Sequence, residues 1–133
     1  VTPARERFWT LSRFAASIES SAHNNFKETI VNVKEGGTQL TLKELAPVRL
    51  VKNKFYQDVQ DLYEKCPSKE ELIQLLGRAR AKKGMFEGDL DEGELEIGQI
   101  AGLIHEILPV VQIIQLMITE FEAACEEKAK FDF

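Results

Sequence analysis

The stretch from residue 53 to residue 79, NKFYQDVQDLYEKCPSKEELIQLLGRA, decides the fold class. Its first half repeats apolar residues at helical spacing and ends at Pro67, which cannot continue a helix. Ser68 and Glu71 form a capping box, the signature of a second helix start. Residues 53–83 are therefore predicted to form a helical pair. Its apolar positions are Phe55, Val59, Leu62, Tyr63, Cys66, Leu72, Leu75, Leu76 and Ala79.

The C-terminal part continues this pattern and predicts a helical hairpin over residues 94–128. Ile97, Ile100, Ala101, Ile104, Ile107 and Leu108 share one predicted face. Pro109 suits the first turn of a last helix. Val110, Ile113, Ile114, Met117, Phe121 and Ala124 are expected to face inward, with Val111, Leu116 and Ile118 on the flanks. So wide an apolar face predicts that this helix is central to a bundle, or packs on another chain or a missing domain.

Residues 8–52 carry weaker signals. Phe8 to Ile18 is apolar and β-capable without clean alternation, and the stripe of Phe26, Ile30 and Val33 predicts a short helix that stops at Gly36 and Gly37. Leu40 and Leu42, and then Val48 to Val51, suggest short extended segments. Residues 1–133 thus read as one mainly α domain or fragment with at most two or three short strands.

Composition excludes several classes of function. The 133 residues are 44% hydrophobic and carry a net charge of −5, so no basic surplus exists for a nucleic-acid partner. The apolar run 107–118 is too short to cross a membrane. Cys66 and Cys125 lie far apart and are expected to be reduced, which together with the absence of a targeting signal indicates a cytoplasmic protein.

Residues 84–93 combine three glycines with acidic side chains. Asp89 and Asp91 begin like a calcium-binding EF-hand, but the twelfth position is Ile100 rather than glutamate. A mobile, solvated loop is the favoured interpretation, and a lid or hinge that lets backbone approach a ligand is the alternative.

No catalytic or metal site is complete in this sequence. His23 and His105 are the two histidines, and neither has partners at metal-ligand spacing. His23 is interpreted as a cap, surface or interface residue. Glu19 and Glu106 would serve as bases only if they were buried.

Four stretches in order resemble the C-terminal part of the nitronate monooxygenase family, formerly the 2-nitropropane dioxygenases, whose relatives include the enoyl-acyl carrier protein reductase II enzymes. They are Ser12–His23, Pro47–Asn53, Leu76–Asp89 and Glu94–Ile100, and the resemblance covers about Ser12 to Ala124. It implies a (β/α)₈ barrel that binds FMN, of which this chain holds the helical C-terminal segment, with the barrel itself incomplete.

The resemblance also implies the cofactor-binding residues. Ser12 and Arg13 stand where the family's backbone contacts the FMN phosphate, and Leu11 replaces the family's glycine there. Gly98 and Gln99 match a late Gly-Gln pair expected near the flavin. The catalytic histidine of the family would lie upstream of this region, so no catalytic residue is assigned.

Two functions follow as expectations. The first is the C-terminal part of an FMN-dependent oxidoreductase acting on a nitronate or an enoyl thioester, inactive unless the missing N-terminal barrel portion complements it. The second is a non-catalytic helical module, derived from that family, that forms a homo-oligomer through its last helix. An acidic adaptor unrelated to flavin is a third interpretation.

Overall fold

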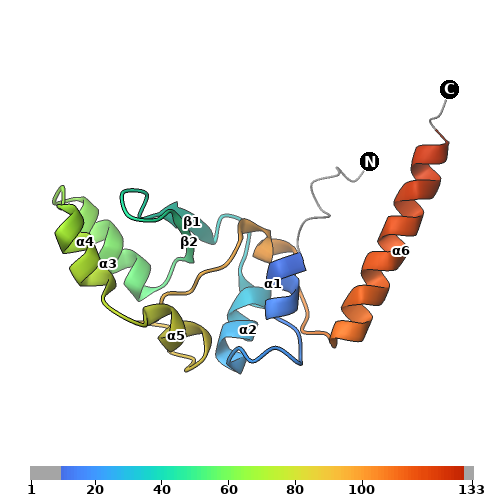
Figure 1. Cartoon of the computed structure of the whole chain (residues 1–133), viewed down its shortest axis with the longest axis horizontal. Helices are drawn as coiled ribbons and strands as arrows, with labels where there is room; N and C mark the ends of the chain where they lie inside the picture. The colour runs from blue at the N-terminus through green and yellow to red at the C-terminus, as the bar shows by residue number, and fades with distance from the viewer. Residues whose placement is uncertain (1–9, 131–133) are drawn as a thin grey trace.

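The computed structural model of the chain describes residues 10–130 (Figure 1). Within that range the protein is mainly helical with two short strands, as predicted. β1 (Thr38–Thr41) and β2 (Val48–Val51) pair antiparallel, with Thr38 opposite Val51. The helices are α1 (Thr10–Ala15), α2 (Asn24–Asn32), α3 (Lys54–Tyr63), α4 (Lys69–Leu76), α5 (Arg80–Met85), the 3₁₀ helix η2 (Gln99–Leu103) and α6 (Val110–Ala129).

The predicted helical pair is present as α3 and α4. Asn53 caps α3, because its side-chain oxygen accepts a hydrogen bond from the backbone of Tyr56 at 3.0 Å. The capping box of α4 is complete: the Glu71 N–H donates to Ser68 Oγ at 3.2 Å, and the Ser68 N–H donates to Glu71 Oε2 at 2.8 Å. The start of each helix is therefore fixed by the residue that the sequence provides for it.

Two apolar clusters lie on either side of β2. One contains Leu42, Leu50, Phe55, Val59 and Leu72, and joins the sheet to α3 and α4. The other contains Ala16, Ala22, Phe26, Ile30, Leu95, Ile97, Ala101 and Ile104, and joins α2 to η2. β2 contributes to both, because Leu50 belongs to the first cluster and Val51 packs on the second. The α3–α4 pair lies at one end of the long axis, and the sheet and α5 separate it from α1 and α2 (Figure 1).

The expected helix over residues 94–108 is wrong. Leu95 to Ile97 is extended and lies beside β2, where Glu96 forms an isolated bridge with Leu50. The Val51 N–H donates to Leu95 O at 3.0 Å, and the Ile97 N–H donates to Arg49 O at 3.1 Å. Leu95 and Ile97 are buried while Glu96 is exposed, which is the alternation of a strand. The same apolar positions fit either one face of a helix or a short strand followed by a 3₁₀ turn. Their spacing alone therefore did not distinguish the two structures.

Two further expectations are corrected. Residues 10–15 form a helix rather than an extended segment, and Phe8 and Trp9 lie outside the described residues. On α6, Ile113 is buried as expected, but Ile114, Met117 and Phe121 are exposed. α6 stands away from the rest of the molecule, with its start next to α1 (Figure 1). The inward face that the pattern predicts therefore has nothing within the described residues to cover most of it.

Candidate cofactor-binding site

Ser12 and Gly98 meet although they are far apart in the sequence. Ser12 lies in α1 and is buried, and Gly98 caps the start of η2, which packs against α1. A Cβ atom at position 98 would lie 3.3 Å from Ser12 Oγ, which is tighter than an ordinary contact. Glycine thus allows the backbone to approach the serine hydroxyl closely. The structure brings together one residue from each half of the predicted site.

The other predicted site residues are placed differently. The guanidinium of Arg13 pairs with the Glu106 carboxylate at 3.7 Å, and the arginine side chain is largely shielded. Gln99 is exposed beside Gly98. Leu11, in the place of the family's glycine, is 84% exposed, so its side chain points away from the packed side of α1. Glu106 was considered as a base, but it is exposed and engaged in this ion pair.

Three contacts hold α1 and the turn after it against residues 106–110. They are the Arg13–Glu106 pair, the Ile18 N–H donating to Leu108 O at 3.1 Å, and the Val110 N–H donating to Glu19 Oε2 at 2.9 Å. The last contact satisfies a free N–H group in the first turn of α6, where Pro109 provides no side-chain cap. Glu19 is therefore a long-range helix cap rather than a base.

Lys27 fixes the same turn from inside the molecule and was not singled out by the sequence. The residue is 4% exposed, and its ammonium donates to Ile18 O at 3.1 Å and to Ser20 O at 2.8 Å. A buried charge is tolerated when hydrogen bonds replace its hydration. The signal that could have revealed it is a lysine directly beside Phe26, on the apolar stripe of α2.

Replacing Lys27 with methionine is expected to lower the free energy of unfolding by about 2 kcal/mol. The variant removes two charge-assisted hydrogen bonds and leaves two carbonyl oxygens without their donor, which outweighs the easier burial of the apolar side chain. Urea denaturation followed by circular dichroism measures the change. Lys34→Met is the control, because Lys34 is exposed. Equal effects in both variants would contradict the role given to Lys27.

His23 caps α2, as one of its interpretations predicted. Its Nδ1 accepts a hydrogen bond from the Asn25 backbone at 3.1 Å. The ring also covers Gly88, where a Cβ atom would lie 2.3 Å from Nδ1. Asn25 Nδ2 donates to Gly88 O at 3.0 Å. The start of α2 therefore packs against, and hydrogen bonds to, the glycine-rich segment formed by residues 84–93.

The segment 84–93 is more ordered than the favoured interpretation of a mobile loop implied. Asn53 Nδ2 donates to the carbonyl oxygens of Leu90, Asp91 and Gly93 at 2.9, 3.3 and 2.8 Å. Asp89 Oδ1 accepts from the backbone of Asp91 and Glu92 at 3.1 and 2.9 Å. These bonds hold the pKa of the Asp89 carboxyl below its usual value, the Glu92 N–H contributing most. The acidic side chains here organise backbone, and residues 80–85 belong to α5.

Glu92 links this segment to two neighbouring helices. Its carboxylate pairs with the Lys54 ammonium and with the Arg80 guanidinium, the latter at 3.4 Å. The hydrogen bond from Lys54 is the main cause that lowers the pKa of Glu92, and Arg80 adds to it. Arg80 also donates to Leu75 O and Glu92 O, and its guanidinium lies 4.7 Å from the centre of the Phe55 ring. α3, α4, α5 and the glycine-rich segment are thus joined at one point.

Glu94 is a buried carboxyl beside this junction. Burial raises its pKa, the charge of Glu96 raises it further, and Arg80 partly offsets both. Because the folded state binds the proton more tightly than the unfolded state, the stability that depends on Glu94 falls as the pH rises through the carboxyl range.

Replacing Glu94 with glutamine is therefore expected to raise the melting temperature at neutral pH. The gain should shrink as the pH falls through the carboxyl range, since protonation then removes the charge from the wild-type side chain as well. Thermal unfolding at several pH values, with the exposed Glu64→Gln as control, measures it. A gain that did not change with pH would contradict the explanation.

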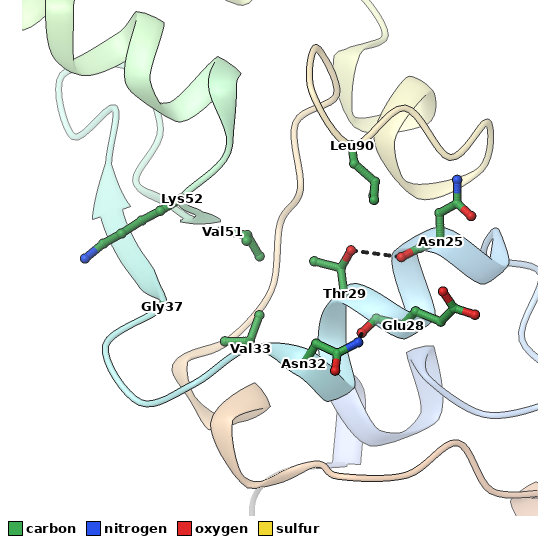
Figure 2. A pocket seen from close by; sticks show the side chains of 9 residues that line it. All are labelled: Asn25, Glu28, Thr29, Asn32, Val33, Gly37, Val51, Lys52 and Leu90. Atoms are coloured by element: carbon green, nitrogen blue, oxygen red, sulfur yellow. Dashed lines mark hydrogen bonds between the residues drawn. The ribbon is translucent and has the colours of Figure 1, made fainter.

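A cleft of about 430 Å³ lies between α2, the end of β2 and the glycine-rich segment. Figure 2 shows Val33, Val51 and Leu90 around its middle, and Lys52 pointing away from it. Two of its polar groups are already engaged: Thr29 Oγ1 donates to Asn25 O and Asn32 Nδ2 donates to Glu28 O, each at 2.8 Å. The cleft is separate from the Ser12–Gly98 contact, and its side chains do not form a set for catalysis.

Over residues 10–130, no group of three or more His, Cys, Asp or Glu side chains is arranged to hold a metal ion. In the same range, none of the helices combines the length and the hydrophobicity needed to span a bilayer. Cys66 and Cys125 are free and exposed.

Comparison with known proteins assigns the family. A model of the family described as nitronate monooxygenase matches residues 10–120. FabK from Thermotoga maritima is 33% identical, with a TM-score of 0.78 over 91% of this chain and 38% of its own. A mutant of the same FabK gives a TM-score of 0.73 at 33% identity, over 91% of this chain and 36% of its own. Comparison with curated proteins finds no match.

The class that fold and site define is a mainly helical portion of the FabK-like (β/α)₈-barrel proteins. The chain belongs to the nitronate monooxygenase family. It spans between 36% and 38% of the length of FabK.

Proposed function

We propose that this chain is the C-terminal part of an FMN-dependent oxidoreductase of the nitronate monooxygenase or enoyl-acyl carrier protein reductase type. The observation that carries the proposal is the contact between Ser12 and Gly98. Each residue comes from a stretch that resembles the family, and a merely accidental resemblance gives no reason for the two to meet. Family membership supports the same conclusion.

Ser12, Arg13 and Gly98 suit the phosphate side of such a cofactor. Serine offers a hydroxyl, glycine lets a ligand approach its backbone, and the fixed guanidinium supplies positive charge nearby. The Glu106 carboxylate partly neutralises this charge and fixes the position of the guanidinium. Arg13 therefore contributes positive charge near the phosphate rather than binding it directly. FMN, when bound, supplies the redox chemistry, and the chain supplies part of its binding surface.

We propose that the chain is inactive by itself. The chain matches 38% of FabK, so more than half of that protein lies outside the match, and a (β/α)₈ barrel builds its active site from loops that follow several strands. Because FabK is an enoyl-acyl carrier protein reductase II, an enoyl thioester is the favoured substrate, with a nitronate as the alternative. The two free cysteines favour a cytoplasmic location.

The test is a titration of the chain with FMN and with riboflavin, followed by flavin fluorescence. Riboflavin lacks the phosphate, so a site on the phosphate side should bind FMN and not riboflavin. Gly98→Val places a bulky side chain against Ser12 and should weaken FMN binding, while Gly102→Ala, which meets ordinary contact distances, should not. Equal affinity for both flavins, or no binding of either, would refute the proposed site.

A second candidate is a non-catalytic module that self-associates through α6. The exposed apolar residues of α6 favour it. Sedimentation equilibrium, read together with the flavin titration, distinguishes the two functions. A stable homo-oligomer that binds no flavin would support the non-catalytic module.

A further inference from the structure

Two arginines of this chain are similarly shielded from water but differently bound. The side chains of Arg13 and Arg80 are 21% and 24% exposed. The Arg80 guanidinium is part of the packed fold, because it donates to two backbone carbonyl oxygens and lies over the Phe55 ring. The partner of Arg13 is the Glu106 carboxylate at 3.7 Å, a separation longer than a hydrogen bond. The charge of Arg13 is therefore available to a ligand, whereas the charge of Arg80 is committed to the fold.

The other charged side chains around the turn after α1 are already engaged. The Lys27 ammonium donates to two backbone carbonyl oxygens of this turn. The Glu19 carboxylate accepts a hydrogen bond from the Val110 N–H. Arg13 and Glu106 are joined by charge alone. Of these side chains, they are therefore the pair whose charges can act on a bound anion.

Glu106 is kept beside Arg13 by the backbone that follows it. The Ile18 N–H donates to Leu108 O at 3.1 Å, two residues after Glu106, and this bond fixes the segment against the turn after α1. The Glu106 side chain itself is 60% exposed. Its carboxylate therefore stays near the guanidinium while it remains hydrated, which makes a weak ion pair.

The charge of Arg13 lies next to the contact between Ser12 and Gly98, because Arg13 and Ser12 are consecutive residues of α1. A phosphate ester carries about two negative charges at neutral pH. A guanidinium attracts such a group, and a carboxylate beside the guanidinium offsets part of that attraction. Glu106 therefore lowers the attraction of this site for a phosphate.

We propose that Glu106 limits the affinity of this site for an anionic ligand by neutralising the charge of Arg13. The inference rests on the proposed function, since the ligand is taken to be FMN with its phosphate at the contact between Ser12 and Gly98. It adds a regulating residue to that site. Because Glu106 acts on the phosphate charge, its removal should strengthen the binding of FMN and leave the binding of riboflavin unchanged.

Replacing Glu106 with glutamine in the whole chain tests the proposal. A titration followed by flavin fluorescence should show roughly fivefold tighter binding of FMN, the effect of removing one exposed negative charge close to a phosphate. The gain should shrink as salt is added, because salt screens exposed charges. The control is Glu64→Gln, which changes the net charge equally at the end of α3, away from α1 (Figure 1), and should have no effect.

A double replacement shows whether the effect passes through Arg13. Arg13→Gln should weaken the binding of FMN. Adding Glu106→Gln to that variant should change the affinity little further, because no guanidinium charge is left to neutralise. A full gain from Glu106→Gln in the Arg13→Gln background would overturn the role given to the ion pair.

The chemistry of arginine gives a second readout that needs no flavin. Phenylglyoxal modifies guanidinium groups, and peptide mass spectrometry measures each arginine separately. Arg13 should react roughly threefold faster in Glu106→Gln than in the wild type, as the loss of a weak ion pair predicts. The exposed Arg78 should react equally in both and serves as the internal control. Glu106→Ala removes the same charge and must reproduce the result.

The outcomes separate this inference from the proposed function. A chain that prefers FMN to riboflavin but binds FMN equally with and without Glu106→Gln overturns the inference and leaves the proposed function standing. Equal reactivity of Arg13 toward phenylglyoxal in the two proteins overturns the inference as well. If neither the wild type nor Glu106→Gln prefers FMN to riboflavin, the proposed function is refuted and the inference with it.

Discussion

Replacing Phe55 with alanine is expected to lower the free energy of unfolding by about 4 kcal/mol, the largest effect anticipated for a single change in this chain. Phe55 lies in the first turn of α3 and is fully buried against the sheet and α4. Alanine would leave a cavity there and would remove the ring on which the Arg80 guanidinium lies. That guanidinium also binds the glycine-rich segment, so the damage should extend beyond the cluster.

Urea denaturation measures this loss, and Phe86→Ala is the matched control. Phe86 is 49% exposed, so the same truncation there should cost less than about 1 kcal/mol. Hydrogen exchange should also quicken at residues 89–93, because Arg80 and Asn53 hold that segment. Similar losses for the two phenylalanine variants would contradict the description of this cluster as a core.

Replacing Gly93 with alanine is expected to cost about 3 kcal/mol, because the new methyl group would meet backbone rather than a movable side chain. Its Cβ atom would lie 2.3 Å from Asp89 O and 2.4 Å from Gly84 Cα. The chain must then separate α5 from the segment that follows it. The hydrogen bond from the Glu94 N–H to Arg80 O, which joins the same two parts, should weaken with it.

Gly102→Ala is the control for this prediction. Its Cβ atom would lie 3.4 Å from the nearest atom, Glu35 N, so the substitution should be almost neutral. Denaturation of both variants, with hydrogen exchange at residues 84–94, measures the difference. A Gly93→Ala variant as stable as Gly102→Ala would show that the segment yields freely, which is the mobile loop first expected.

The helices that carry local start and stop signals could be predicted from the sequence. Ser68 and Glu71 fix the start of α4, and Pro67 separates it from α3. Residues 95–97 were assigned to a helix from the spacing of their apolar residues. Their extended conformation instead depends on hydrogen bonds to Arg49 and Val51 of β2, which are far away in the sequence. Local spacing contains no information about such a partner.

The candidate site was predicted only as far as the resemblance reached. Ser12 and Gly98 were named, and the structure places them in contact. Nothing in the sequence indicated that Arg13 forms an ion pair with Glu106. Lys27 and Asn53 were missed, since their importance comes from the carbonyl oxygens that tertiary packing brings to them. A lysine or an asparagine looks ordinary until its acceptors are known.

The sequence by itself determined that this protein is mainly helical, that two short extended segments separate its helices, and that its last helix has an apolar face wider than the chain can bury. Those properties depend on periodicity and on caps within a few residues. The tertiary structure decided which residues meet: Ser12 with Gly98, Asn53 with the glycine-rich segment, and Glu19 with the start of α6. Contacts between distant segments depend on how whole elements pack, and only the folded chain specifies that.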